Sequence, residues 1–395
     1  MRLAMGIAVA AALLAGAAMA DDRMSRTIGK ALFERAWVPA PSSTKANDGL
    51  GPLFNARACA SCHAGLERMP VTTDPTGKVT GESLVLRFSD GAGRADPVYG
   101  KQLQTAAVPG VEPEGRIALS VAGPVPHDLE GPVGEGTRYG ARIAPALRGL
   151  GRLEAVPEDE LLKLADPDDS DGDGISGRAG FVYARDGGYQ VGRFGWKASA
   201  ARLSDMVEMA FSTDLGLSTP GRPAPWGDCG EKQSECLAAP HGGDLNTPEI
   251  TGELVAMIRD YLAAVAPPSR EPTAENAEGT ALFANTGCSA CHAPALPSPK
   301  GPVQAYTDLL LHDMGDELDG GATEPGVDSR EWRTAPLWGL SRILASGSGL
   351  LHDGRARTLD EAIRAHGGEG RQARSRYMAL DKDDRERLLA FVSSL

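Results

Sequence analysis

The chain has 395 residues, and its 53 acidic residues outnumber its 40 lysines and arginines, giving a formal net charge of −13. An acidic surface repels phosphate backbones, which argues against nucleic acid as a partner and favours a basic or dipolar protein. The length predicts about two domains.

Residues 1–20 have the pattern of a secretory signal peptide. Arg2 precedes the apolar stretch 3–15, and Ala-Met-Ala at 18–20 fits a cleavage site. A membrane anchor is the alternative, but the apolar stretch is short for a bilayer, and no other stretch is apolar for long enough. We therefore expect a soluble periplasmic protein and not an integral membrane protein.

Two similar phrases carry the clearest chemical signal: "LFNARACASCH" at 53–63 and "LFANTGCSACH" at 282–292. A CxxCH motif can be a redox dithiol, part of a zinc site, or an attachment point for c-type haem, in which two thiols bond the porphyrin and the imidazole binds the iron. Zinc usually needs four ligands, and a dithiol would not require a histidine both times. The sequence therefore predicts two covalently bound haem c groups. The predicted residues are Cys59, Cys62 and His63 for haem 1, and Cys288, Cys291 and His292 for haem 2.

Residues 82–145 form a long insert after the first motif. Runs such as "LVLRF" and "RIALSVA" alternate apolar and polar residues, which predicts a few short strands. His127, which we expect to be exposed in a loop, is the first histidine after His63.

The stretch "DPDDSDGDGISG" resembles the first half of an EF-hand loop. Asp169, Asp171 and Asp173 alternate and are followed by Gly174, but Gly180 stands where the bidentate glutamate belongs. This stretch is either a calcium loop completed by residues from elsewhere or an acidic turn. We favour calcium.

The two remaining cysteines, Cys229 and Cys236, lie in a stretch rich in glycine and proline. Unprotected thiols are rare in oxidising compartments, so we predict a disulfide between them.

A larger unit repeats around the two CxxCH motifs. The segment "RIAPALRGLGR" at 142–152 matches "RTAPLWGLSR" at 333–342, and a helical pattern follows in each half, at 194–210 and at 350–366. Each half therefore has the same order of motif, Arg-x-Ala-Pro turn and helix.

The helix predicted within the segment 350–366 ends in a histidine on its apolar face. Thr358 and Glu361 fit a capping box at its start. The apolar face consists of Leu359, Ala362, Ile363 and His366. A buried imidazole needs a partner, so we predict that His366 is the sixth ligand of haem 2.

In the first half, the corresponding face is Leu203, Met206, Val207 and Ala210. Because Ala210 stands where His366 stands, we expect haem 1 to be open or weakly ligated and reactive, and haem 2 to be a closed electron relay. Met206 or Met209 could bind iron, although methionines on such helices usually fill cores.

We also predict a helix over 249–265, with Thr247 as its N-cap and Pro248 at its first position. Pro267-Pro268 ends it and begins a linker, and a final helix uses Leu388, Leu389, Val392 and Leu395. The predicted domains are 21–268, with haem 1, and 269–395, with haem 2. The predicted fold class is mainly α, with two cytochrome c-like haem domains in tandem.

The paired CxxCH motifs, "RTAPLWGL" and "LLHDGRARTLDEAI" resemble bacterial di-haem cytochrome c peroxidases and the related enzyme that matures the tryptophan-derived cofactor of methylamine dehydrogenase. "GLGPLFNARACASCHAG", "DSDGDGISGR", "GRFGWKA" and "DLLLHDMG" are more similar to the di-haem oxidoreductases, a branch also described as thiol oxidoreductases. The resemblance covers nearly all of the mature chain and implies haem-dependent redox chemistry.

The resemblance also implies site residues. His366 occupies the place of a methionine in the peroxidases and of a tyrosine in the maturation enzyme, which implies a bis-histidine haem 2 of low potential. "FGWK" resembles the phrase that holds a tryptophan between the two haems, so Trp196 is the candidate bridge. "DLG" stands in place of a phrase with the catalytic glutamate, so Asp214 is the candidate acid–base residue.

Other histidines are predicted to be structural: His312 and His352 could bond a haem propionate or cap a turn. The functional prediction is a periplasmic di-haem oxidoreductase of cytochrome c peroxidase type. It would act on peroxide or on a protein or thiol substrate, with a small cytochrome c or cupredoxin as its electron partner. The alternatives are a non-catalytic di-haem electron carrier and a thiol enzyme without haem.

Overall fold

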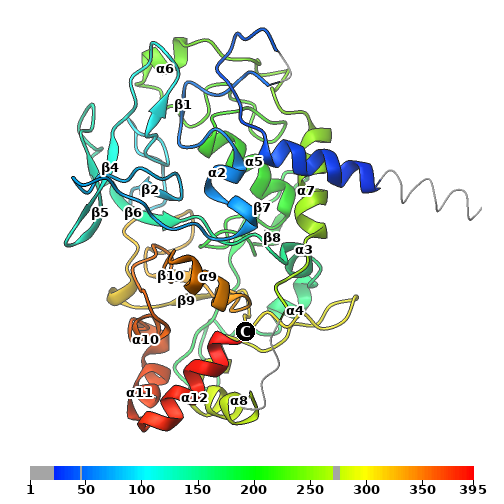
Figure 1. The fold of residues 1–395 in the computed structure, drawn as a ribbon, viewed down its shortest axis with the longest axis vertical. Coiled ribbons are helices and arrows are strands. Elements are labelled where there is room, and N and C mark those ends of the chain that lie inside the picture. The colour runs from blue at the N-terminus through cyan, green and yellow to red at the C-terminus, as the bar shows by residue number, and fades with distance from the viewer. Residues whose placement is uncertain (1–21, 45–46, 270–275) are drawn as a thin grey trace, which may run out of the picture.

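The computed structural model describes residues 22–44, 47–269 and 276–395 (Figure 1). The predicted signal peptide and most of the predicted linker therefore lie outside the described residues. None of the described helices is long and apolar enough to span a membrane.

Eight of the described α-helices form two groups (Figure 1). The first group contains helix 22–34, α2 (Cys59–Cys62), α5 (Leu203–Asp214) and α7 (Gly252–Ala264). The second contains α8 (Asn276–Asn285), α10 (Leu359–Arg364), α11 (Arg371–Ala379) and α12 (Lys382–Ser393). The remaining α-helices are α3 (Leu150–Glu154), α4 (Glu158–Leu162), α6 (Ser234–Ala238) and α9 (Leu340–Ser346). Short 3₁₀ helices occupy Ala64–Leu66, Cys288–Ala290, Asp316–Leu318 and Gly368–Gly370.

The strands of the described chain form five two-stranded antiparallel sheets. The pairs are β1 (Leu53–Phe54) with β3 (Ala106–Ala107), β2 (Leu84–Ser89) with β6 (Arg138–Ile143), β4 (Arg116–Ser120) with β5 (Gly123–His127), β7 (Phe181–Tyr183) with β8 (Tyr189–Val191), and β9 (Leu311–Asp313) with β10 (Glu331–Arg333). At 31% helix and 16% strand, the fold is mixed and not mainly α as predicted. The prediction failed because short strands pair across long loops, which leave little periodic signal in the sequence.

The predicted strands of the insert are confirmed, since β2 and β4 coincide with the two alternating runs. His127 ends β5 and does not lie in a loop, because β4 and β5 pair in register up to Arg116 and His127. Its side chain is exposed, as predicted.

The predicted repeat of the Arg-x-Ala-Pro segment is confirmed in the backbone. In each half, a strand (β6 or β10) leads through the segment to a short helix (α3 or α9). Gly149 and Gly339 precede these helices, and both adopt left-handed backbone conformations, with φ of 77° and 74°. Glycine suits this conformation because it lacks a Cβ.

Helix α7 begins later than predicted, at Gly252, with Thr251 as its N-cap. The preceding residues are held elsewhere: the amide of Ile250 donates to the carbonyl of Ser218, and the Glu249 carboxylate accepts from the amide of Ser218. The capping box of α10 is confirmed at Thr358 and Glu361.

The three largest apolar cores of the described chain pack the helices. One packs α5 and α7 against helix 22–34, and Cys59 lies against it. Another packs α8, α10 and α12 together, and Cys288 lies against it. The third joins Leu153 and Val191 to Leu296 and Leu310, so it contains residues from both sides of the predicted domain boundary.

Candidate functional site

The first CxxCH motif forms the single turn of α2, followed by His63. His63 donates from Nδ1 to the backbone carbonyl of Pro145 over 2.8 Å. Burial lowers the pKa of His63 to about 4, so the imidazole is neutral at pH 7. With its proton on Nδ1, the ring presents Nε2 as an electron-pair donor, which is the state that binds iron.

The second motif has the same arrangement. His292 donates from Nδ1 to the carbonyl of Tyr306 over 2.9 Å, and burial lowers its pKa to about 4. The acceptor differs between the halves: Pro145 belongs to the repeated Arg-x-Ala-Pro segment, whereas its counterpart Pro336 does not receive this bond. Tyr306 had no signal in the sequence, because a backbone carbonyl can come from any residue type.

The cysteines of both motifs fit covalent haem attachment. Cys59, Cys62, Cys288 and Cys291 are free of disulfides, whereas Cys229 and Cys236 form the predicted bond, with Cα atoms 6.3 Å apart. Burial, and then the charge of Asp214, raises the pKa of Cys59 to about 12. A thiol that stays protonated is poorly suited to disulfide exchange, which disfavours a dithiol enzyme.

Buried cations also fit a haem, which carries propionate carboxylates. Four basic side chains lie near the contact between the two halves and are at most 9% exposed: Arg68, Arg142, Lys197 and Arg333. None of them forms an ion pair with a carboxylate of the described residues. Their bonds go to backbone carbonyls. Burial lowers the pKa of Lys197 to about 7, so its charge at neutral pH is partial, whereas the three arginines stay charged. Burying unpaired positive charge is costly, so this region suits an anionic group.

His366 follows α10, which ends at Arg364, two residues earlier than the predicted helix. Its Nδ1 donates to the carbonyl of Ala362 over 2.7 Å, so Nε2 is again the electron-pair donor. Burial is the main cause of the lowered pKa of His292; the bond to Tyr306 opposes it, and the charge of His366 lowers the pKa further. The two imidazoles therefore lie within range of an electrostatic interaction.

Helix α5 does not present one uniform face to the first motif. Val207 and Phe211 belong to the core that Cys59 contacts. Met206 and Met209 pack instead against the third core, with Leu203. The methionines therefore fill a core, as methionines on such a helix usually do.

Asp214, the last residue of α5, lies beside the first motif. Its charge contributes to the raised pKa values of both Cys59 and Cys62. Gln102 Nε2 donates to Asp214 Oδ1 over 2.8 Å and to Asn55 Oδ1 over 2.6 Å. Burial raises the pKa of Asp214, which favours a carboxyl group able to hold a proton.

A polar cavity of about 610 Å³ is lined in part by Asn55, which shares the Gln102 side-chain amide with Asp214. Asn55 and Glu82 line it, and the Glu82 carbonyl accepts a hydrogen bond of 2.9 Å from the thiol of Cys62. The lining of the cavity therefore includes Glu82, which is bonded to Cys62 of the first motif, and Asn55, which shares Gln102 with Asp214.

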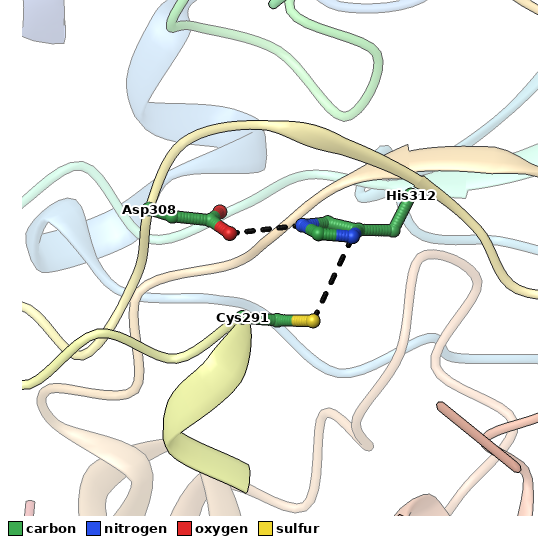
Figure 2. Close-up of side chains that lie close together, drawn as sticks. All are labelled: Cys291, Asp308 and His312. Carbon is green, nitrogen blue, oxygen red and sulfur yellow. Dashed lines mark hydrogen bonds and ion pairs between the residues drawn. The ribbon is translucent and has the colours of Figure 1, made fainter. Parts of the chain in front are cut away.

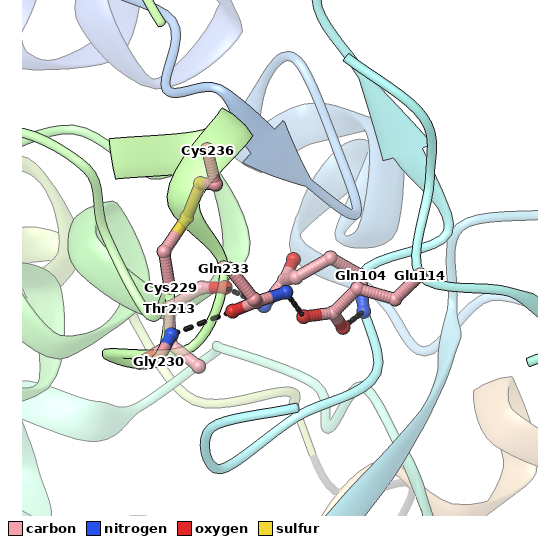
Figure 3. The surroundings of a disulfide bond; sticks show 7 residues. All are labelled: Gln104, Glu114, Thr213, Cys229, Gly230, Gln233 and Cys236. Atoms are coloured by element: carbon pink, nitrogen blue, oxygen red, sulfur yellow. Dashed lines mark hydrogen bonds between the residues drawn. A yellow bond between two sulfur atoms is a disulfide. The ribbon is translucent and has the colours of Figure 1, made fainter. Parts of the chain in front are cut away.

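A second buried carboxyl group, Glu114, lies near the disulfide (Figure 3). Its two chain neighbours, Pro113 and Gly115, line the cavity. Its oxygens accept from the amide of Gln104 over 2.6 Å and from Gln233 Nε2 over 2.7 Å. Gln233 lies within the loop closed by the disulfide and accepts from the amide of Gly230, while Gln104 Nε2 donates to the carbonyl of Thr213, next to Asp214. The sequence did not reveal this network, because polar residues in irregular loops have no periodic pattern.

Glu114 should make stability depend on pH. Burial raises the pKa of Glu114 to about 8, above its ordinary value of 4.5, despite opposing hydrogen bonds. The folded state therefore holds a proton that the unfolded state releases, so the free energy of unfolding is expected to fall as pH rises from about 5 to 8. The loss should be at most a few kcal/mol, because a pKa difference of one is worth about 1.4 kcal/mol.

Glu114→Gln is expected to remove this part of the pH dependence, measured by denaturant unfolding at pH 5 and pH 8. Glu112→Gln, an exposed position in the same loop, is the matched control and should behave as wild type. Equal pH dependence in wild type and Glu114→Gln would contradict the assignment.

Trp196 lies where the two halves meet. Its Nε1 donates to the carbonyl of Ile143 over 2.8 Å, and the Arg68 guanidinium lies 5.4 Å from its ring centre. From the other half, the amide of Arg333 donates to the Trp196 carbonyl over 3.0 Å. Arg68 follows the first motif closely, so Trp196 contacts residues associated with both halves.

His312 lies beside the second motif (Figure 2). Its Nε2 donates to Asp308 over 2.8 Å and its Nδ1 to Glu369 over 2.7 Å, and Nδ1 is 3.6 Å from Cys291 Sγ. Burial opposes a charge on the ring, but the bond to Asp308 and then those to Cys291 and Glu369 hold its pKa well above the usual value. Because both nitrogens donate to protein carboxylates, the ring is not arranged as the predicted partner of a propionate. An imidazolium also cannot bind a metal ion.

His352 stacks on Trp332 with ring centres 3.7 Å apart. Burial, followed by the charges of Arg142, Arg355 and Lys197, lowers its pKa well below the usual value. It therefore contributes to packing as a neutral ring, in agreement with a structural role.

The acidic loop brings Asp169, Asp171 and Asp173 together, with carboxylate oxygens within 4.8 Å of one another. Their other bonds are local: Asp169 accepts from the amide of Gly174, and Asp173 from that of Ile175. The three predicted calcium ligands therefore lie together, an arrangement that exposed acidic turns also adopt without an ion.

No match was found among curated proteins. A solved structure of hydrazine synthase from Kuenenia stuttgartiensis is 21% identical, over 38% of this chain and 58% of that chain, with a TM-score of 0.26. A likeness this weak carries no argument.

The family model described as "Di-haem oxidoreductase, putative peroxidase" matches residues 133–395. This range contains the second CxxCH motif, Trp196, Asp214 and His366, whereas the first motif precedes it. Because the match covers more than half of the chain, the protein belongs to the di-haem oxidoreductase family.

Proposed function

We propose that this protein is a periplasmic di-haem c-type oxidoreductase of cytochrome c peroxidase type, with a reactive haem 1 and a relay haem 2. The carrying observation is an asymmetry between two similar motifs. His63 and His292 both donate from Nδ1 and so leave Nε2 free to bind iron. A second imidazole, that of His366, interacts electrostatically with His292, whereas the carboxyl group of Asp214 interacts with the first motif.

When bound, the haems would supply one-electron redox chemistry. Cys59, Cys62 and His63 would hold haem 1, and Cys288, Cys291 and His292 would hold haem 2, with His366 as the sixth ligand. Ala210 offers no ligand at the corresponding place in the first half. Asp214 would hold and transfer a proton beside haem 1, since burial already favours its protonated form.

Trp196 is proposed to link the two sites. It contacts Arg68 from the first half and Arg333 from the second, and its ring is fixed by the bond to Ile143. A rigid aromatic ring between two redox centres shortens the gap that an electron must cross. The proposed electron partner is a small cytochrome c or cupredoxin, and the substrate is peroxide or a protein or thiol.

The disulfide between Cys229 and Cys236 supports an oxidising compartment, in line with periplasmic localisation. Fractionation of cells that express the full chain tests this localisation. Recovery of the protein in the cytoplasm with free thiols at these two positions would refute it.

The function is tested by EPR of the purified protein together with turnover. We expect one high-spin and one low-spin haem, and peroxide-dependent oxidation of a reduced small cytochrome c. Two low-spin haems that are inert to peroxide would instead support the non-catalytic electron carrier. A negative pyridine haemochrome assay would show that no haem is bound, and the thiol enzyme without haem would then be the remaining function.

Calcium is proposed to bind at Asp169, Asp171 and Asp173. The charge of the three carboxylates suits a hard cation, and a ligand that binds only the folded state raises stability. We expect EDTA to lower the melting temperature by several degrees and added calcium to restore it. Asp171→Asn should weaken the response to calcium, whereas Asp205→Asn should not; an EDTA-insensitive melting temperature would refute calcium binding.

A further inference from the structure

Exposed apolar side chains gather on hairpin β7–β8 and at the end of α4. Phe181, Tyr183 and Tyr189 are 52%, 70% and 72% exposed, and Leu162 and Leu164 are also exposed. Tyr183 and Tyr189 pair across the hairpin, with ring centres 5.5 Å apart. We call these five residues the tyrosine face. Exposed apolar clusters, particularly those containing tyrosine, are typical of protein interaction sites.

The tyrosine face lies beside a strongly acidic segment. Residues 158–173 contain eight aspartates and glutamates and a single basic residue, Lys163. The two features are physically joined, because α4 packs against β8 and Leu161 shares a core with Val191. An apolar surface bordered by negative charge is complementary to a partner with a basic rim.

Arginines near the hairpin do not cancel this charge. Arg185 pairs with Glu208, and Arg202 pairs with Asp186. The hairpin therefore adds no unpaired positive charge to the surface, which remains acidic.

The same surface is connected to the second haem motif. Ser176, just after the acidic segment, donates from its amide and its hydroxyl group to Glu369, each over 3.1 Å. Glu369 accepts from His312, which lies against Cys291 (Figure 2). Arg178 exchanges backbone hydrogen bonds with Leu311, so the start of the hairpin lies directly against the strand that holds His312.

We propose that the tyrosine face and the acidic segment 158–173 form the docking surface for the electron partner, a small redox protein with an apolar contact edge ringed by lysines. The inference rests on the proposed function and deepens it, because it assigns electron exchange to the surface beside haem 2. A second copy of this chain is a poorer occupant, since it would place two acidic segments together.

The test uses the holoprotein and a basic mitochondrial cytochrome c as the probe. The variants are Tyr183→Ser with Tyr189→Ser, and Asp159→Lys. We expect KM for the reduced cytochrome to rise about tenfold or more in each, because anchor residues and rim charges set docking affinity and encounter rate. Oxidation of a small-molecule electron donor should be unchanged, and salt should slow only the reaction with the cytochrome.

Matched controls are Tyr139→Ser, an exposed tyrosine outside the face, and Glu386→Lys on α12. Calorimetric titration with the oxidised cytochrome measures docking without turnover. Unchanged cytochrome affinity and KM in both variants would overturn the docking proposal, and continued small-molecule turnover would show that the proposed function survives. A dimer that is lost in the tyrosine variant would assign the face to a second copy and also overturn the proposal.

Discussion

Replacement of His366 by alanine is expected to convert haem 2 from a six-coordinate low-spin centre to a high-spin centre and to abolish electron delivery from protein donors. His366 presents Nε2 because its Nδ1 is bonded to the carbonyl of Ala362. It also lies close enough to His292 to affect its pKa. Among the histidines of the described chain, only His312 also contributes to the pKa of His292. Both ring nitrogens of His312 already donate to carboxylates.

EPR and optical spectra of fully oxidised protein measure the spin state. His127→Ala, which removes an exposed histidine, is the matched control and should leave both spectra unchanged. His366→Met adds a second readout: the haem should stay low-spin while its potential rises, because methionine ligation favours the reduced iron. An unaltered spectrum of the alanine variant would refute the ligand assignment.

The parts of the site that sequence could predict are those whose chemistry demands particular residue types. The proposed haem attachment would require two cysteines and a histidine at fixed spacing, so both CxxCH motifs stood out in the sequence. The disulfide between Cys229 and Cys236 followed from thiol chemistry and is confirmed. The Thr358–Glu361 capping box was readable for the same reason, because only a few side chains can satisfy a helix start.

Features that depend on long-range contacts could not be predicted. Helix α7 starts at Gly252 because Glu249 and Ile250 bond to Ser218, a segment distant in sequence. The acceptor for His292 is the carbonyl of Tyr306, which carries no residue-specific signal. The same limit applies to β2 and β6, whose pairing brings together segments about fifty residues apart.

Helix α5 was predicted correctly, but the sequence suggested one buried side where the structure has two. The apolar face was read as one surface, yet Val207 faces the core at the first motif and Met206 faces another core. A helix packed on two sides has no single buried stripe, so periodicity cannot say which side faces a cofactor. The position of Asp214 at the end of this helix therefore emerges only from the fold.

Replacing Asp214 with asparagine is expected to reduce peroxide turnover by about 10²- to 10⁴-fold, the usual contribution of a positioned acid–base group. Asparagine keeps the shape and can still accept the hydrogen bond from Gln102, but it cannot exchange a proton. Because burial raises the pKa of Asp214, this residue should also contribute an ionisation above the usual aspartate range to the profile of kcat/KM against pH. The asparagine variant should lack that ionisation.

Asp214→Glu and Asp205→Asn make this prediction specific. Glutamate restores the proton-exchanging group with one additional methylene, so it should recover part of the activity, whereas Asp205→Asn, in the first turn of the same helix, should behave as wild type. Haem content must be compared by pyridine haemochrome, because Asp214 lies beside the thiols of Cys59 and Cys62. Full turnover in Asp214→Asn at equal haem content would exclude Asp214 as the acid–base group. The next residue to substitute would then be Glu114, which is linked to the same helix through Gln104.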